Sequence, residues 1–277
     1  MAAFSSAVDP SLRPPRTNWF FRVRVSILLG ILLLVLGWAA RDMQQRRARN
    51  AWEAPVRVAL VVLRLGPTEP AGVHRLMLRT RALEQRLSDE FRRYHPGAPN
   101  MFRFETFGPL EITHAPPSDT GNTLLERAIH AFSLWRYTTA VNTSARLDSR
   151  DFDARLYLVI EPTQGGQQFV EGFSEDGGRI GVARVNLDPT TVDLSLFVAG
   201  HELLHTLGAR DKYDAASGFT LIPDGLAEPD RYPLYPQRGA EVMARNRVLM
   251  PGAERPPEAL GELFVGRATA REIGWLK

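Results

Sequence analysis

The sequence of 277 residues lacks cysteine altogether. This absence excludes disulfide bonds, cysteine nucleophiles, iron–sulfur clusters and thiolate zinc sites, so any metal site must use histidine and carboxylate ligands. No internal repeat is present either. Hydrophobic residues make up 44% of the chain and charged residues 23%. These proportions exclude long disorder, collagen and coiled coil as the dominant state, and they predict a buried core in one large or two small domains.

Long hydrophobic runs are scarce, and residues 25–40 form the run that stands out because it carries no charge. As a helix these sixteen residues span about 24 Å, and Trp19 to Arg24 can extend them toward the ~30 Å of a bilayer core. We therefore expect a transmembrane signal anchor over 25–40, preceded by a tail over 1–24 and followed by a juxtamembrane linker over 41–55. The alternatives are a signal peptide cleaved after Ala39 and a buried core helix.

Arginines flank this apolar run on both sides. Four precede it and four follow it, namely Arg13, Arg16, Arg22 and Arg24, then Arg41, Arg46, Arg47 and Arg49. This tie leaves the positive-inside rule undecided. We expect a cytoplasmic tail with the large domain on the extracytoplasmic side, because a lone N-terminal span commonly acts as a signal anchor.

The formal charge of +3 is unevenly distributed along the chain. Eight arginines against three acids give +5 over residues 1–53, and 26 basic against 28 acidic residues give −2 over the remainder. The basic character therefore belongs to the flanks of the apolar run. This indicates membrane lipid as a partner through residues 25–40 and argues against a nucleic-acid partner.

Residues 56–277 are predicted to form one α+β domain. β-branched and aliphatic residues over 56–65 and 155–160 predict buried strands, and the apolar spacing over 71–94 predicts a helix. The other expected elements are an extended segment over 101–112, a helix capped by Asp119 or Thr120 and running to Tyr137, strands over 169–173 and 179–185 joined through Asp176-Gly177, a helix that starts at Asp188 and Pro189, and a long irregular loop over 221–237.

One predicted helix carries the residues of a metal site. His201 and His205 are four positions apart, so a helix places both imidazoles on one face as two ligands of one zinc ion. Glu202 lies beside them and can take a proton from zinc-bound water. Gly208 suits the left-handed residue that ends a helix, after which Asp211 can supply the third protein ligand.

Other interpretations of these residues stay open. The histidines and the glutamate can simply pair with neighbours on a buried amphipathic helix, and Asp214 is the nearest substitute for Asp211. A gluzincin takes its third ligand from a glutamate in a later helix, for which the chain offers Glu241, Glu254, Glu258 and Glu262. Two histidines and a carboxylate also bind non-haem iron. The alternative from another functional class is a membrane-anchored, non-catalytic scaffold protein, although such a protein has no need of Glu202.

The pattern His201-Glu202-x-x-His205-x-x-Gly208-x-x-Asp211 resembles the extended zinc motif of the metzincin metalloproteases. Most of that clan use histidine as the third ligand, and the aspartate resembles the snapalysin-type variant. The resemblance implies a mixed twisted sheet, a zinc-binding active-site helix, a methionine turn and a C-terminal helix. Together with the apolar run, it implies a membrane-anchored, zinc-dependent endopeptidase that hydrolyses polypeptides with Glu202 as general base.

The resemblance also implies roles for residues outside the motif. Met243 is the preferred methionine of the turn and Met250 the alternative, and the C-terminal helix falls within 265–275. In this fold an edge strand before the zinc helix pairs with extended substrate, and by position that strand is 179–185. The candidates that could stabilise the oxyanion of the reaction are Tyr213, Tyr232, Tyr235, Arg210, Arg238 and Arg245.

Overall fold

A computed structural model describes residues 19–118, 123–162, 170–174 and 178–277. The chain divides into two compact units, Met1–Arg47 and Ala48–Lys277, and each is described by itself. The predicted turn at Asp176-Gly177 and the predicted cap residues Asp119 and Thr120 lie outside the described residues.

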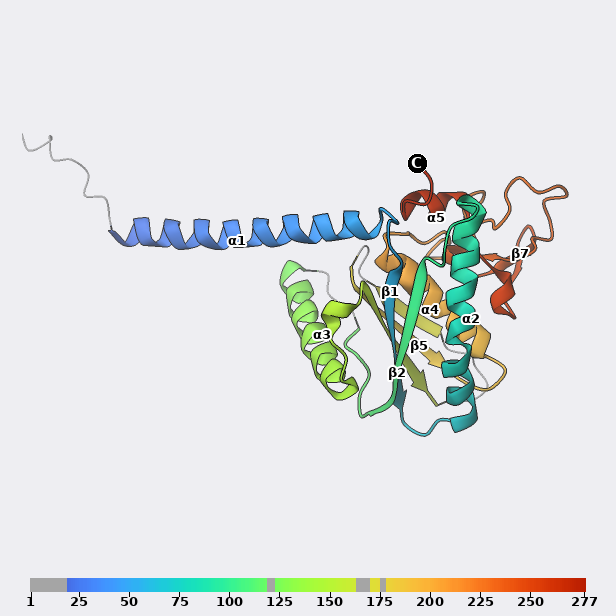
Figure 1. Ribbon diagram of the computed structural model, residues 1–277, viewed down its shortest axis with the longest axis horizontal. Helices are drawn as coiled ribbons and strands as arrows, with labels where there is room; N and C mark the ends of the chain where they lie inside the picture. The colour runs from blue at the N-terminus through green and yellow to red at the C-terminus, as the bar shows by residue number, and fades with distance from the viewer. Residues whose placement is uncertain (1–18, 119–122, 163–169, 175–177) are drawn as a thin grey trace, which may run out of the picture. The chain divides into compact units, whose positions relative to one another are not determined.

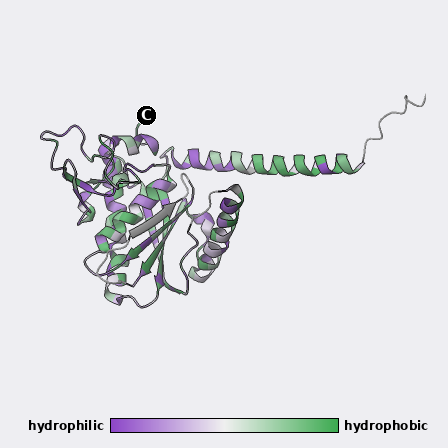
Figure 2. Ribbon diagram, turned by 180° about the vertical axis from the view of Figure 1, so that it is seen from behind, coloured by the Kyte–Doolittle hydropathy of each residue, from purple (hydrophilic) through white to green (hydrophobic). Residues whose placement is uncertain are grey.

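The described part of the first unit is helix α1 (Trp19–Arg49), whose last two residues already belong to the second unit. The helix is long and apolar enough to cross a membrane. Figure 2 shows the apolar run, which gives way to hydrophilic residues toward Arg49. The expected linker over 41–55 needs correction. The helix continues through its arginine-rich end, and residues 48–55 are part of the second unit.

The second unit contains a five-stranded sheet with the strand order β2-β1-β3-β5-β4. The strands are β1 (Val56–Leu65), β2 (Phe102–Ile112), β3 (Ala154–Glu161), β4 (Val170–Ser174) and β5 (Ile180–Asn186). The neighbours β2, β1, β3 and β5 are parallel, and β4 pairs antiparallel with β5. The prediction of an α+β domain with a mixed sheet is therefore confirmed.

The prediction that 179–185 forms an edge strand is wrong. Strand β5 pairs with β3 on one side, where Val182 lies opposite Tyr157, and with β4 on the other, where Val182 lies opposite Phe173. After β3 the chain first forms β4 at the edge, and it then returns to fill the position next to β3. Strand β4 therefore carries this edge of the sheet.

Helices cover both faces of the sheet (Figure 1). Helices α2 (Pro70–Tyr94) and α4 (Val192–Thr206) pack on one face, and α3 (Leu124–Ala145) packs on the other. Alternate residues of β1 divide between two cores, with Val58, Leu60 and Val62 in the first and Ala59, Val61 and Leu63 in the second. The aliphatic run of β1 is thus buried on both faces, as is usual for parallel strands covered by helices.

Two helices begin later than predicted, because the polar residues before them make other contacts than expected. Thr123 caps α3, since its hydroxyl accepts from the Glu126 N–H while the Glu126 carboxylate accepts from the Thr123 N–H. This helix also runs beyond Tyr137, to Ala145. The predicted cap Asp188 accepts from the N–H groups of Thr190 and Thr191, which delays the start of α4 to Val192.

The chain after α4 contains mostly turns and short elements. No helix or strand is assigned within the described residues 221–237, which confirms the predicted irregular loop. The elements outside the sheet and the long helices are η2 (Ser149–Asp151), β6 (Ala240–Glu241), η3 (Val242–Ala244), β7 (Arg247–Met250), β8 (Ala253–Arg255), η4 (Leu260–Glu262), β9 (Leu263–Phe264) and α5 (Arg267–Glu272). Helix α5 lies within the range in which a C-terminal helix was expected.

Candidate metal centre

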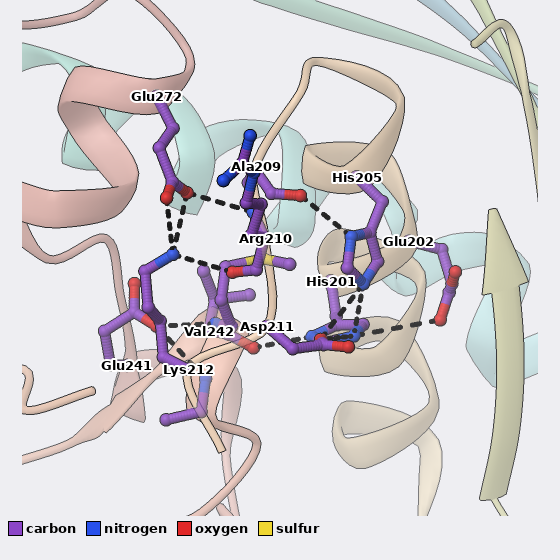
Figure 3. A network of polar contacts seen from close by, with 12 residues as sticks. His201, Glu202, His205, Ala209, Arg210, Asp211, Lys212, Glu241, Val242 and Glu272 are labelled. Atoms are coloured by element: carbon purple, nitrogen blue, oxygen red, sulfur yellow. Dashed lines mark hydrogen bonds and ion pairs between the residues drawn. The ribbon is translucent and has the colours of Figure 1, made fainter. Parts of the chain in front are cut away.

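Helix α4 brings the two histidines together at its C-terminal end (Figure 3). Both side chains are largely buried, and their Nε2 atoms lie 3.0 Å apart. The imidazole rings are nearly perpendicular, at 88°, with their centroids 4.6 Å apart. The spacing of His201 and His205 by one helical turn therefore places one nitrogen of each ring at a common point, as predicted from the sequence.

Backbone carbonyls fix the orientation of both rings. The Nδ1 of His201 lies 2.9 Å from the carbonyl oxygen of Val242, and the Nδ1 of His205 lies 2.9 Å from that of Ala209. Because a carbonyl oxygen only accepts, each Nδ1 must carry the proton. In a neutral ring the lone pair is then on Nε2, which faces the other ring. Such a hydrogen bond at the second nitrogen is the usual way in which a protein orients a histidine ligand.

Asp211 joins the two histidines because the chain reverses after α4. Gly208 has a φ of +100°, the left-handed conformation that suits glycine, and the segment that follows passes back beside the helix. The Oδ1 of Asp211 lies 3.1 Å from the Nε2 of His205 and 3.4 Å from the Nε2 of His201. These three side chains form the group of potential metal ligands found among the described residues.

The separations between the three ligand atoms suit a small tetrahedral ion. In a zinc site with bonds of about 2.0–2.1 Å, neighbouring ligand atoms are about 3.3 Å apart. The three observed separations range from 3.0 to 3.4 Å. Three atoms that accept hydrogen bonds thus converge, two from buried imidazoles and one from the Asp211 side chain, which is 40% exposed. A divalent cation would compensate their mutual repulsion, so this group can hold a metal ion.

The charges of the group are strongly coupled. Burial raises the pKa of Asp211, but when His201 and His205 also carry a proton on Nε2, their hydrogen bonds to the carboxylate and their positive charge outweigh burial and hold this pKa well below its usual range. Burial lowers the pKa of His205, but the hydrogen bond that its protonated ring donates to the Asp211 carboxylate and the negative charges of Glu202 and Asp211 raise it overall. The Asp211 carboxylate is therefore ionised near neutral pH, as a metal ligand must be.

Glu202 lies beside the group without belonging to it. Its Oε1 is 4.0 Å from the Nε2 of His201, and only 3% of the residue is exposed. At this distance the carboxylate does not share the point where the three ligand atoms converge. It is instead within reach of a small molecule bound at that point, which is the position required of a general base.

Backbone carbonyls of the turn η3 contact the metal group and the segment beside it. The Val242 carbonyl orients His201, and the Met243 carbonyl accepts from the N–H of Lys212, the residue after Asp211. The fully buried carboxylate of Glu241 holds this turn, because it accepts from the N–H groups of Met243 and Ala244. It also accepts from the Gly266 N–H and the Thr269 hydroxyl at the start of α5.

The side chain of Lys212 fastens the segment after α4. Its Nζ lies 2.9 Å from the Arg210 carbonyl and 2.8 Å from each carboxylate oxygen of Glu272, and Figure 3 shows this arrangement. The N–H of Arg210 also donates to Glu272. The Asp211 backbone is therefore held on both sides by one carboxylate of α5.

The other candidate ligands have partners elsewhere. Asp214 accepts from the N–H and hydroxyl of Ser217. The four glutamates considered for a gluzincin are Glu241, described above, Glu254, which accepts from the Thr220 N–H, and Glu258 and Glu262, which pair with Arg255. None of these carboxylates belongs to the metal group found among the described residues.

The environments of the two methionines differ, and so do those of Tyr213, Tyr232 and the half-buried Tyr235. Met243 is completely buried in η3, whereas Met250 is 58% exposed. Tyr232 is 98% exposed, and Tyr213 lies beneath the Arg245 guanidinium, which is 5.0 Å from the ring centroid. Burial and the neighbouring Asp211 carboxylate raise the pKa of Tyr213, which Arg245 opposes. Tyr213 is therefore the candidate tyrosine whose phenol interacts with Asp211 of the metal group.

Some functional contacts were not predicted from the sequence. The carbonyls of Val242 and Ala209 carry no side-chain signature, so the motif alone does not indicate them. The buried Glu241 and the Lys212–Glu272 pair depend on segments that meet only in the fold. The sequence signal for the pair is a lysine directly after a predicted ligand.

Replacing Gly208 by alanine is expected to lower the free energy of unfolding by about 1–2 kcal/mol, because a β-carbon disfavours the left-handed backbone. The added β-carbon would lie no closer than 3.9 Å to the Glu272 carbonyl oxygen, so the effect is conformational rather than steric. Urea unfolding measures it. Gly261→Ala is the matched control, because its β-carbon would meet no atom within 4 Å. An equal loss in both variants would contradict the conformational explanation.

Comparisons with known proteins do not identify a family for this chain. No profile of a known protein family matches the sequence, and no curated protein matches it. One similar solved structure is described as "Structure of a chaperone-substrate complex", with 20% sequence identity and a TM-score of 0.33. The likeness covers 68% of this chain and 30% of that one. At this TM-score it carries no argument about fold or function.

Proposed function

We propose that the chain is a membrane-anchored zinc metallopeptidase of the metzincin type. The observation that carries the proposal is the convergence of His201 Nε2, His205 Nε2 and Asp211 Oδ1 at spacings suited to zinc, with the Glu202 carboxylate beside them. Cysteine is absent from the chain, so a histidine and carboxylate site is the kind of zinc site that it can build. A glutamate base next to two histidines one helical turn apart is the arrangement with which zinc peptidases hydrolyse peptide bonds.

The roles of the residues follow from their positions. His201, His205 and Asp211 would hold zinc, which when bound supplies a Lewis acid that polarises a carbonyl and lowers the pKa of water. Glu202 accepts the proton of the attacking water and then donates it to the leaving amine. The phenol of Tyr213 is the candidate donor to the developing oxyanion, because it lies beside the third ligand and under the Arg245 guanidinium.

The features expected of a metzincin have counterparts in the second unit. Gly208 allows the chain to return with Asp211, which takes the place of the third histidine. Turn η3 contains the buried Met243, and its Val242 carbonyl orients His201. We take it as the candidate methionine turn. Helix α5 follows and is tied to that turn through Glu241. Turn η3 and helix α5 lie outside the motif, so these two correspondences support the proposal independently of it.

The proposed polypeptide substrate has a strand available for pairing. Strand β4 lies at the edge of the sheet and next to α4, the helix that carries the metal group. An extended peptide added to this edge would form backbone hydrogen bonds with β4. We therefore assign to β4 the role that the sequence had suggested for 179–185.

Helix α1 would serve as the membrane anchor. Its apolar residues are exposed, and the helix is long enough to cross a bilayer. We propose that the enzymatic unit faces the extracytoplasmic side, as the expected behaviour of a lone N-terminal span suggests. The zinc ion and the polypeptide substrate are then the partners of the second unit, and membrane lipid is the partner of the first.

Removing the metal tests the proposal. The full-length protein, purified in detergent, is expected to contain about one zinc ion per chain and to cleave a fluorescently labelled unfolded protein. A chelator should abolish cleavage, and added Zn²⁺ should restore it. Zinc without cleavage would favour the non-catalytic scaffold, and iron in place of zinc would favour a non-haem iron site. A protein that binds no metal would refute the proposal.

A further inference from the structure

The last carbonyl groups of α4 have two kinds of partner. The chain itself satisfies Leu203, Leu204 and His205, whose carbonyls accept from N–H groups between Leu207 and Ala209. The next two carbonyls, of Thr206 and Leu207, accept instead from side chains far away in the sequence. Carbonyls at a helix end need such partners because no further turn of helix supplies them.

These partners come from the last residues of α1 and the segment that connects it to β1. We name residues 48–53 the juxtamembrane strap. The Arg49 guanidinium donates to the Thr206 carbonyl and also to those of Asp153 and Gly178, which precede β3 and β5. The side-chain amide of Asn50 donates to the Leu207 carbonyl at 2.7 Å. One arginine thus joins the end of the metal-binding helix to the beginnings of two central strands.

Trp52 fastens the strap to the core. Its ring centroid lies 5.3–5.6 Å from those of Phe91, Phe102 and Trp275, and its indole N–H donates to the Ile273 carbonyl at 2.8 Å. The backbone of the strap also lies close to Gly274, where an added β-carbon would meet the Asn50 carbonyl at 2.9 Å. The strap therefore occupies a fixed position on the second unit.

Thr206, whose carbonyl Arg49 contacts, links the strap to the metal group. Thr206 directly follows His205, whose ring is oriented by the Ala209 carbonyl just beyond the helix end. A guanidinium at the C-terminus of a helix also interacts favourably with the helix dipole. We infer that Arg49 is a positioning residue, which fixes the end of α4 and thereby the geometry of His205, Ala209 and Asp211. The inference rests on the proposed metal function.

The position of a cut between the anchor helix and the second unit determines whether the strap is retained. A cut N-terminal to residue 48 keeps the strap on the second unit, so metal affinity is preserved. Loss of residues 48–53 removes the two donors at the end of α4 together with the Trp52 anchor, and metal affinity falls. Metal affinity at the proposed active site thus depends on whether the strap stays attached to the second unit.

Metal affinity in the full-length protein tests the role of Arg49. Zn²⁺ dissociation constants are measured in detergent by competition with a chelating dye, and Arg49→Ala is expected to weaken binding about tenfold, as for residues that orient ligands indirectly. Arg47→Ala is the matched control, because this neighbouring arginine is exposed. Thr123→Ala is the control for lost stability, because it removes the cap of α3 far from the metal group in sequence. Both controls should bind Zn²⁺ like the wild type.

Hydrogen exchange separates failure of this inference from failure of the proposed function. Amides of residues 203–209 should exchange faster in Arg49→Ala than in either control, whether or not metal is present. Faster exchange in a protein that binds no Zn²⁺ would support the positioning of the helix end while the metal function fails. Unchanged exchange would overturn the assignment. If the wild type binds Zn²⁺, an affinity of Arg49→Ala equal to that of Thr123→Ala would overturn it too. A Co²⁺ absorption spectrum altered in Arg49→Ala alone would support it.

Discussion

Glu202→Gln is expected to reduce the turnover of an unfolded protein substrate by at least about a hundredfold, within the 10²–10⁴ range typical of a lost general base. Glutamine keeps the size of the side chain but cannot accept the proton of the attacking water. The Glu202 carboxylate is outside the point where the three ligand atoms converge, so the zinc content should remain that of the wild type. Turnover and zinc are measured on the same purified sample.

The control for this variant is Glu258→Gln, which makes the same chemical change at a carboxylate whose side chain is 76% exposed. This control should retain full activity. Equal turnover by Glu202→Gln and the wild type would remove Glu202 as the base. Loss of zinc from Glu202→Gln would show that the carboxylate is needed to hold the metal. Either result would require a different mechanism for the same site.

The local features of the fold were predictable because their signals lie within a few residues of one another. The aliphatic run over 56–65 predicts β1 at its observed bounds, since burial on both faces requires consecutive apolar residues, as over 58–63. The helix over 71–94 likewise follows from its apolar spacing. The starts of α3 and α4 were less accurate, because several polar residues compete to cap a helix and only their contacts decide.

The order of the strands was not predictable in the same way. The sequence marks 179–185 as extended, but the strands on either side of it depend on where β3 and β4 lie in space. The strap was missed for a related reason. Residues 48–55 form a short stretch at the charged end of an apolar helix, which is typical of a linker. Only the contacts of Trp52 with three distant aromatic rings show that this stretch belongs to the core.

The three candidate ligands were predictable, because one helix and the turn after it bring them together. A spacing of four residues brings His201 and His205 together, and Gly208 allows Asp211 to reach them. The orienting groups were not predictable, because backbone carbonyls have no sequence signature and Glu241 acts through a buried network. The ligands of the site are therefore encoded locally, whereas their orientation depends on the whole second unit.

His205→Ala is expected to weaken Zn²⁺ binding by more than about a hundredfold, beyond the 10–100-fold typical of residues that only orient ligands. The variant removes one of three converging ligand atoms and leaves the other two without a third protein donor. Competition with a chelating dye on the full-length protein measures the affinity. Circular dichroism checks that the fold is kept, because loss of a buried imidazole leaves a cavity next to the core.

The same measurement decides the third ligand. Asp211→Ala should also lose Zn²⁺, and Asp214→Ala, which changes the nearest alternative carboxylate, should not. Asp211→Asn distinguishes charge from geometry, since an amide oxygen has a similar position but lacks the negative charge that the two histidines stabilise. Intermediate affinity in Asp211→Asn would show that the carboxylate contributes charge as well as a donor atom. Zn²⁺ retained in Asp211→Ala would exclude the metzincin-like assignment of the third ligand while leaving the two histidines in place.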